Sequence, residues 1–144
     1  MKLKRIEYSK LNARQKENFN VQKLSVVLTD YGFVTIRLSD DWQGADLIAQ
    51  HVDGTTFLRV QLKGRLVFYQ KYRGKDLWIA FNDGDAWHLY PHDEFLRRVL
   101  RITGIGSTVS WTERGGYSWP RVPAGLRKIL SRYRITGDTR LIPE

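Results

Sequence analysis

Three polar side chains near the middle of the chain have types and spacing that suit phosphate-ester chemistry. They are Asp46, which follows Gly-Ala, and Gln61 and Lys63, which lie within Val-Gln-Leu-Lys. Alternate residues of a strand point to the same face, so Gln61 and Lys63 are expected to share one. Carboxylate, amide and backbone carbonyl oxygens suit Mg²⁺, and a nearby lysine can orient or help to deprotonate an attacking water. These residues therefore predict metal-assisted hydrolysis of a phosphodiester bond.

The segments around these residues predict a β-hairpin that would bring them together. Residues 46–52 and 56–65 have strand-like sequences, and Asp53-Gly54 between them favours a tight turn because glycine accepts a positive φ. An antiparallel register around this turn places Asp46 opposite a residue near 61. We therefore expect the three side chains to converge at one end of a sheet.

The rest of the sequence predicts a mixed α/β domain with one central sheet. Asn12 is a suitable N-cap for the first helix, and Gly32 a suitable left-handed residue at its end. Segment 66–72 either continues the sheet or forms a separate segment. The other expected elements, in chain order, are a helix over 11–33, a strand over 33–38, a loop over 39–45, a hairpin of 77–81 with 86–90, a helix over 91–103, a loop over 111–123 and a helix over 124–134.

The order Gly-Ala-Asp, hairpin, Val-Gln-Leu-Lys resembles the signature of the PD-(D/E)xK nucleases, which have the restriction-endonuclease-like fold. That family has a mixed central β-sheet flanked by helices. The resemblance implies that Asp46 takes the place of the first acid, Gln61 that of the second acid and Lys63 that of the lysine. An acid on the first helix often completes the site in this family, and Glu17 falls at a suitable place. The likeness covers about residues 10–90. Within the family, the chain resembles Holliday-junction-resolvase-like or homing-endonuclease-like members, with a variant D…QxK motif.

The sequence departs from the family pattern in two places. Ala45 precedes Asp46 where proline is common, and Gln61 replaces an acid. A neutral amide binds a cation less strongly than a carboxylate, so Glu17 would have to supply the missing charge. Asp46, Gln61 and Glu17 are thus the expected ligands of Mg²⁺ or Mn²⁺, with Lys63 as the fourth catalytic residue. The alternatives are a polar edge of a sheet for the motif residues and a helical ion pair for Glu17.

The charge of the chain favours a polyanionic partner. Its 24 Lys and Arg against 15 Asp and Glu leave a formal net charge of +9, and cations that neutralise phosphates release condensed counterions. The alternatives to contact with DNA are a solvated surface for the basic residues and a cover over the core for the aromatic residues of 111–123. The expected DNA contacts are Arg59, Arg65, Lys71, Arg73, Lys75, Arg114, Trp119 and Arg121.

Composition and length narrow the possible kinds of site, the location and the number of domains. The chain lacks cysteine, so thiolate metal sites and cysteine nucleophiles are excluded. It has no apolar run typical of a signal peptide or a membrane span, so we expect a cytoplasmic protein with no membrane partner. Its 144 residues suit a single nuclease-like domain over 1–144, with a core of about 10–103 and a C-terminal loop and helix over 104–144.

Three functions are consistent with these observations. The first is a Mg²⁺-dependent DNA endonuclease that uses a metal-activated water. It would act as a homodimer or higher homo-oligomer, since symmetric cutting needs two sites. The second is a catalytically inactive DNA-binding protein on the same fold, with Gln61 as the mark of a decayed site. The third is a protein-interaction domain whose charge is incidental.

Overall fold

The computed structural model describes residues 1–138, the side chains of residues 41 and 42 excepted. Within this range the chain forms a six-stranded mixed sheet in the order β1-β2-β3-β5-β6-β8 and a two-stranded sheet of β4 and β7. The elements are η1 (Tyr8–Lys10), α1 (Ala13–Thr29), β1 (Phe33–Trp42), β2 (Ala45–His51), β3 (Phe57–Leu62), β4 (Leu66–Tyr69), η2 (Gln70–Tyr72), β5 (Leu77–Asn82), β6 (Trp87–Pro91), α2 (His92–Ile102), η3 (Ile105–Ser107), α3 (Val109–Thr112), β7 (Gly116–Trp119), α4 (Ala124–Leu130), η4 (Ser131–Tyr133) and β8 (Arg134–Ile135).

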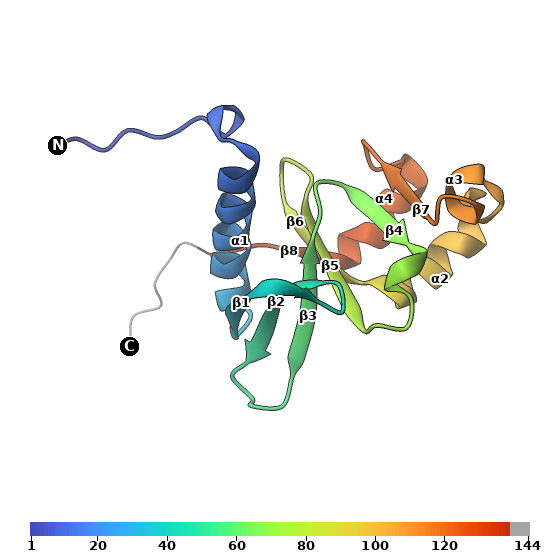
Figure 1. Cartoon of the computed structure of the whole chain (residues 1–144), viewed down its shortest axis with the longest axis horizontal. Helices are drawn as coiled ribbons and strands as arrows, with labels where there is room; N and C mark the ends of the chain where they lie inside the picture. The colour runs from blue at the N-terminus through green and yellow to red at the C-terminus, as the bar shows by residue number, and fades with distance from the viewer. Residues whose placement is uncertain (139–144) are drawn as a thin grey trace.

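The large sheet lies between α1 on one side and α2 and α4 on the other (Figure 1). Each side has its own apolar core. On one face, Leu24 and Leu28 of α1 pack against β2, β3, β5 and β6. On the other face, α2, α4 and the small sheet pack against β5 and β6. The expected fold class, a mixed central sheet flanked by helices, is confirmed.

Burial of strand β5 on both faces explains why its sequence is apolar almost throughout. Leu77, Ile79 and Phe81 belong to the core under α2 and α4, whereas Trp78 and Ala80 belong to the core under α1. Alternate residues of a strand face opposite ways, so a strand covered on both faces needs apolar residues at every position. It pairs in parallel with β3 and antiparallel with β6.

The hairpin β2–β3 forms as predicted. Gly54 has a φ of +77°, and the Asp53 carboxylate accepts hydrogen bonds from the backbone N–H groups of Thr55 and Thr56, each at 2.8 Å. These bonds, together with one from the Thr56 hydroxyl, hold the pKa of Asp53 well below its usual range. The turn is therefore fixed by local side-chain chemistry.

Several predicted boundaries were wrong. The first helix ends at Thr29, although Asn12 caps it as predicted and Gly32 has a φ of +82°. The predicted loop over 39–45 belongs largely to β1, which turns into β2 at Gln43 and Gly44, both with positive φ. Residues 66–69 form β4 of the separate small sheet, one of the two expected alternatives.

The segment after residue 104 also differs from its prediction. The expected loop over 111–123 contains part of α3 and all of β7, because β4 offers β7 a partner from far back along the chain. The last helix ends at Leu130 and continues only as the 3-10 turn η4. This segment adds Ile105, Trp111, Leu126 and Leu130 to the core under α2 and α4.

Candidate active site

The register of the β2–β3 hairpin places Asp46 next to Gln61. Leu47 pairs with Val60, and both are buried in the core under α1. One residue further toward the open end, the same register sets Asp46 opposite Gln61, on the other face of the sheet. The register thus places Asp46 across from a residue near 61, as predicted, although the strand pairing itself ends at Leu47 and Val60.

Backbone pairing explains how Asp46 and Lys63 are held. The Lys63 N–H donates to the Ala80 carbonyl at 2.9 Å, extending the parallel pairing of β3 with β5 by one step. On the opposite edge of β3 the pairing with β2 has ended, and the Asp46 Oδ2 atom accepts the Leu62 N–H at 2.9 Å. The carboxylate therefore takes the place of a strand partner at the end of the hairpin.

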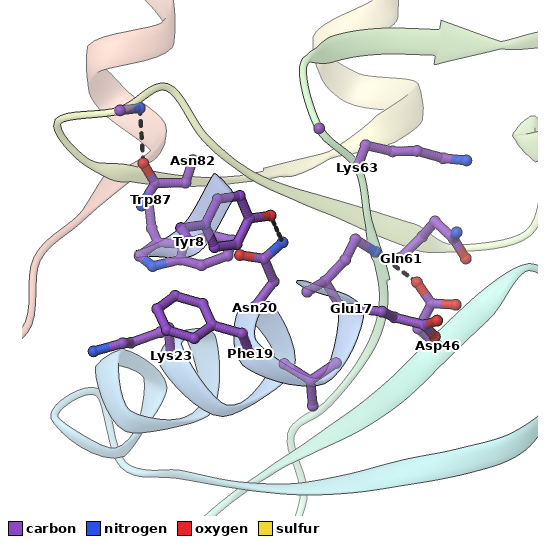
Figure 2. Close-up of a pocket in the computed structure, with 14 residues that line it drawn as sticks. Tyr8, Glu17, Phe19, Asn20, Lys23, Asp46, Gln61, Lys63, Asn82 and Trp87 are labelled. Carbon is purple, nitrogen blue, oxygen red and sulfur yellow. Dashed lines mark hydrogen bonds between the residues drawn. The ribbon is translucent and has the colours of Figure 1, made fainter. Parts of the chain in front are cut away.

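Asp46, Gln61, Lys63 and Glu17 line one open pocket of about 820 Å³ (Figure 2). The side chains of Asp46, Gln61 and Lys63 extend to the same side of β3, and that of Glu17 extends from α1 in the direction of Asp46. The four residues predicted from the sequence are thus brought together. Their catalytic and metal-binding roles stay predictions.

Glu17 has a partner of its own. Its Oε1 atom lies 3.0 Å from an Nη atom of Arg37, and 59% of the Glu17 side chain is exposed. A long-range pair with β1 therefore replaces the helical ion pair considered as its alternative role. Since the pair is exposed, its contribution to stability is small, and Glu17 can exchange Arg37 for another cation at little cost.

Lys63 lies against an aromatic pair. Its Nζ atom is 5.2 Å from the ring centre of Tyr69 and 5.7 Å from that of Tyr72. The Nζ atom of Lys71 lies at 5.2 and 5.3 Å from the same two rings. Aromatic faces attract ammonium groups, so these rings stabilise two cations beside the pocket.

The donor set of the pocket suits a weakly held magnesium ion. Mg²⁺ keeps several waters and takes one or two carboxylates together with substrate phosphates. Asp46, Glu17 and the amide oxygen of Gln61 fit that description, because each carboxylate offers about four acceptor positions. Over residues 1–138 the structure has no group of three or more His, Asp or Glu side chains able to hold a metal.

Sequence reasoning missed several residues of the pocket. Asn20 lies one helical turn after Glu17, and its amide donates to the Tyr8 hydroxyl at 2.9 Å. Lys23 of α1 and Trp87 of β6 line the same pocket. The spacing of Glu17 and Asn20 on one helical face was a usable signal for Asn20, whereas Tyr8 and Trp87 reach the pocket only through tertiary packing.

The predicted DNA contacts fall into separate groups. Arg59 donates to the Lys75 carbonyl at 3.1 Å, and Lys71, Arg73 and Lys75 lie in or just after η2. Arg114 lines a small depression beside Tyr69 and Tyr117. Arg65, Trp119 and Arg121 line a second groove, where Trp119 also packs edge-on against Phe68, as the core-cover alternative expected. Contact of these residues with DNA stays a prediction.

Comparison with known proteins establishes the fold. No protein-family model and no curated protein matches the sequence. Among solved structures, the bacterial homing endonuclease I-Ssp6803I matches over 85% of this chain and 86% of its own, with a TM-score of 0.50 and 18% identity. The chain has the restriction-endonuclease-like fold.

A second match is Hjc, a Holliday junction resolvase from the archaeal hyperthermophile Archaeoglobus fulgidus. It covers 53% of this chain and 72% of that chain, with a TM-score of 0.44 and 22% identity. The match with I-Ssp6803I confirms the restriction-endonuclease-like fold expected from the Asp46, Gln61 and Lys63 pattern. No helix in residues 1–138 has the length and apolar character that crossing a bilayer requires; the cytoplasmic location stays a prediction.

Proposed function

We propose that this protein is a DNA endonuclease that hydrolyses phosphodiester bonds with the help of Mg²⁺ or Mn²⁺. The observation that carries the proposal is the convergence of Asp46, Gln61 and Lys63 from adjoining strand ends in a single open pocket. The restriction-endonuclease-like fold and the net charge of +9 both support a DNA substrate.

The residues of the pocket divide into two roles. Asp46 and Gln61 would hold the cation through their oxygens, and Glu17 would join them by releasing Arg37. When bound there, the cation would neutralise charge on the scissile phosphate and make a water more acidic. Lys63 would orient that water or stabilise the negative charge that develops on the phosphate, with Tyr69 and Tyr72 keeping its ammonium group at the pocket.

Binding of DNA would use the cations around this pocket. Lys71, Arg73 and Lys75 are carried by the segment that also supplies Tyr72, so phosphates bound there would lie next to Lys63. A homodimer or higher oligomer is part of the proposal, because one pocket per chain cuts one strand at a time.

The test is a plasmid-cleavage assay with Mg²⁺ or Mn²⁺ on supercoiled, linear and branched DNA. We expect cleavage that a chelator prevents and that Asp46→Asn and Lys63→Met each reduce by at least about a hundredfold, the usual effect of removing one catalytic group. The amide oxygen that Asp46→Asn introduces could still accept the Leu62 N–H, so that variant should keep its fold. Asp40→Asn, an exposed change outside the pocket, is the matched control. Wild-type protein inactive on every substrate would overturn the proposal.

One observation favours a second function, DNA binding without catalysis. Gln61 is neutral and Glu17 is paired with Arg37, so the pocket has less negative charge toward a cation than a site with three carboxylates. In that case DNA binding would depend on salt but not on chelator, and Asp46→Asn would leave it unchanged.

A further inference from the structure

A second groove, of about 670 Å³, adjoins the candidate active site. The two share Gly64 and Asn82 in their walls, so the start of the β3–β4 connection lies between them. The wall of the second groove also includes residues of β4, β5, the β5–β6 turn and β6, and from the C-terminal part residues of β7, the segment after it, α4, η4 and β8. It therefore depends on the C-terminal part of the chain, which supplies none of the residues around the first pocket.

Four arginines from four separate segments meet in this groove. Arg65 follows β3, Arg121 follows β7, Arg127 lies in α4 and Arg134 lies in β8. All four are exposed, and within residues 1–138 none of them forms an ion pair. Gathering like charges without acidic partners is unfavourable for the folded chain alone, which points to an anionic ligand.

The two acids of the same groove offset only part of the charge of these four arginines. Asp83 accepts hydrogen bonds from the N–H groups of Asp85 and Ala86 and lies 2.8 Å from His88 Nε2, so its carboxylate is engaged locally. Those bonds outweigh its partial burial and lower the pKa of Asp83. With Asp85, the groove has two carboxylates and four guanidinium groups.

Two further features suit a nucleic-acid strand. Trp119 packs on Phe68 and Tyr117 but is partly exposed where it lines the groove, so the exposed part of its indole is available to a base. Guanidinium groups bind phosphate oxygens in a bidentate manner, which favours a phosphodiester backbone over a single carboxylate.

We propose that this second groove, formed by Arg65, Arg121, Arg127 and Arg134, binds the phosphodiester backbone of the DNA segment that extends past Gly64 from the cleavage pocket. The inference deepens the proposed function by extending its substrate to a strand that occupies both cavities. The groove contains no catalytic residue; it fixes the register of the strand.

The test compares two double variants that remove equal charge. Arg121→Gln/Arg134→Gln removes two groove arginines, and Arg97→Gln/Arg101→Gln removes two exposed arginines of α2 that line neither cavity. Affinity for a duplex of about 30 base pairs is measured by fluorescence anisotropy in chelator, between about 50 and 300 mM salt. Circular dichroism checks that both variants are folded.

We expect the groove variant to bind at least about tenfold more weakly, with the slope of log K against log salt reduced by about 1.8, since each lost phosphate contact removes about 0.9. The control variant should keep the slope of the wild type. Equal effects of the two variants, or no effect of the groove variant, would overturn the proposal. The proposal would also be overturned if the groove variant lost affinity for RNA of the same sequence but not for the DNA duplex.

This outcome is separable from that of the proposed function. Because the measurement contains no divalent metal, a groove effect in a protein that never cleaves DNA would uphold the groove and overturn the nuclease. Cleavage by the wild type, together with normal DNA binding by the groove variant, would uphold the nuclease and overturn the groove.

Discussion

Gln61 is the residue on which the proposed binding of a cation in the pocket depends most. It lies opposite Asp46, where a carboxylate would add one unit of negative charge at the same position. A unit charge about 4 Å away contributes on the order of 4 kcal/mol at an effective dielectric of 20, before desolvation is subtracted. Even a small part of that energy changes metal affinity severalfold.

We therefore expect Gln61→Glu to lower the Mg²⁺ or Mn²⁺ concentration for half-maximal binding by at least about tenfold, the equivalent of only 1.4 kcal/mol. Isothermal titration calorimetry on the protein without DNA measures this directly. Gln50→Glu adds the same charge to an exposed position of β2 outside the pocket and is the control. An unchanged midpoint for Gln61→Glu would show that the cation does not bind near residue 61.

The same substitution separates the two candidate functions. If the wild type cleaves DNA, Gln61→Glu should reduce the metal requirement of cleavage. If the wild type is inactive and the variant cleaves, the pocket is a decayed site and DNA binding is the surviving function. Both results are read from the plasmid assay with a divalent metal titration.

Sequence patterns were enough to predict that the three motif residues lie together, because the geometry that joins them is local. Asp46, Gln61 and Lys63 belong to one hairpin, so the turn at Asp53-Gly54 and the alternation of strand faces were enough to bring them together. Tyr8 and Trp87 were missed because they reach the pocket from segments whose approach only the packed core determines.

At the scale of elements, the predictions failed where pairing is long-range or a turn is unusual. Strand β7 has a Gly-Tyr-Ser-Trp sequence with little apolar alternation, and it forms because β4 pairs with it. The turn from β1 to β2 uses Gln43 and Gly44, whose left-handed conformations were not apparent, because glutamine is not a residue that favours a positive φ.

The small sheet couples the C-terminal segment to the active site through Gly116. A Cβ atom at this position would lie 2.4 Å from a ring atom of Tyr69, whose ring contacts Lys63. We therefore expect Gly116→Ala to displace Tyr69 and to destabilise the fold by about 1–3 kcal/mol, as overpacking does. It should also lower cleavage under conditions in which the variant is fully folded.

Urea unfolding and cleavage rates at a low temperature measure the two effects. Gly125→Ala in α4 is the matched control, because a Cβ atom there has no neighbour within 4 Å and alanine favours a helix. A Gly116→Ala variant with wild-type stability would mean that Tyr69 is free to move aside and is not held by β7.

His92 links α2 to the connection that carries Tyr69 and Tyr72. It is fully buried; its Nε2 atom accepts the Tyr69 N–H at 3.1 Å, and its Nδ1 atom lies 2.8 Å from Asp93. Burial lowers the pKa of His92 below its ordinary value of 6.5, Arg73 lowers it further, and Asp93 opposes both. Protonation would turn the Nε2 acceptor into a donor facing the Tyr69 N–H.

The unfolded chain therefore binds a proton at His92 at a higher pH than the folded chain. Stability should be complete above about pH 6.5 and should fall as the pH decreases toward the folded pKa, by at most about 1.4 kcal/mol per pH unit. Urea unfolding between about pH 5 and 8 measures this slope. His92→Gln, which cannot titrate, should flatten it; an equal slope in this variant would contradict the assignment to His92.

At the scale of the whole molecule, charge and symmetry bear on the proposed binding of DNA. A net charge of +9 would attract DNA to many faces at low salt, and within residues 1–138 the two adjoining cavities offer the sites that we propose fix a strand in register. Each chain has one candidate catalytic pocket, and a duplex has two strands. If the proposed nuclease cuts both strands at one place in one binding event, two chains would supply the two pockets.

We expect linear product from supercoiled plasmid to form with about second-order dependence on protein concentration below the dissociation constant of the dimer, while nicking remains about first-order. Mixing wild type with an equal amount of Asp46→Asn should leave about a quarter of dimers with two active pockets, so linear product falls more than nicked product. Analytical ultracentrifugation at the same concentrations gives the mass of the species. A protein that is monomeric with DNA bound, and linearises plasmid at first order, would contradict the need for two chains.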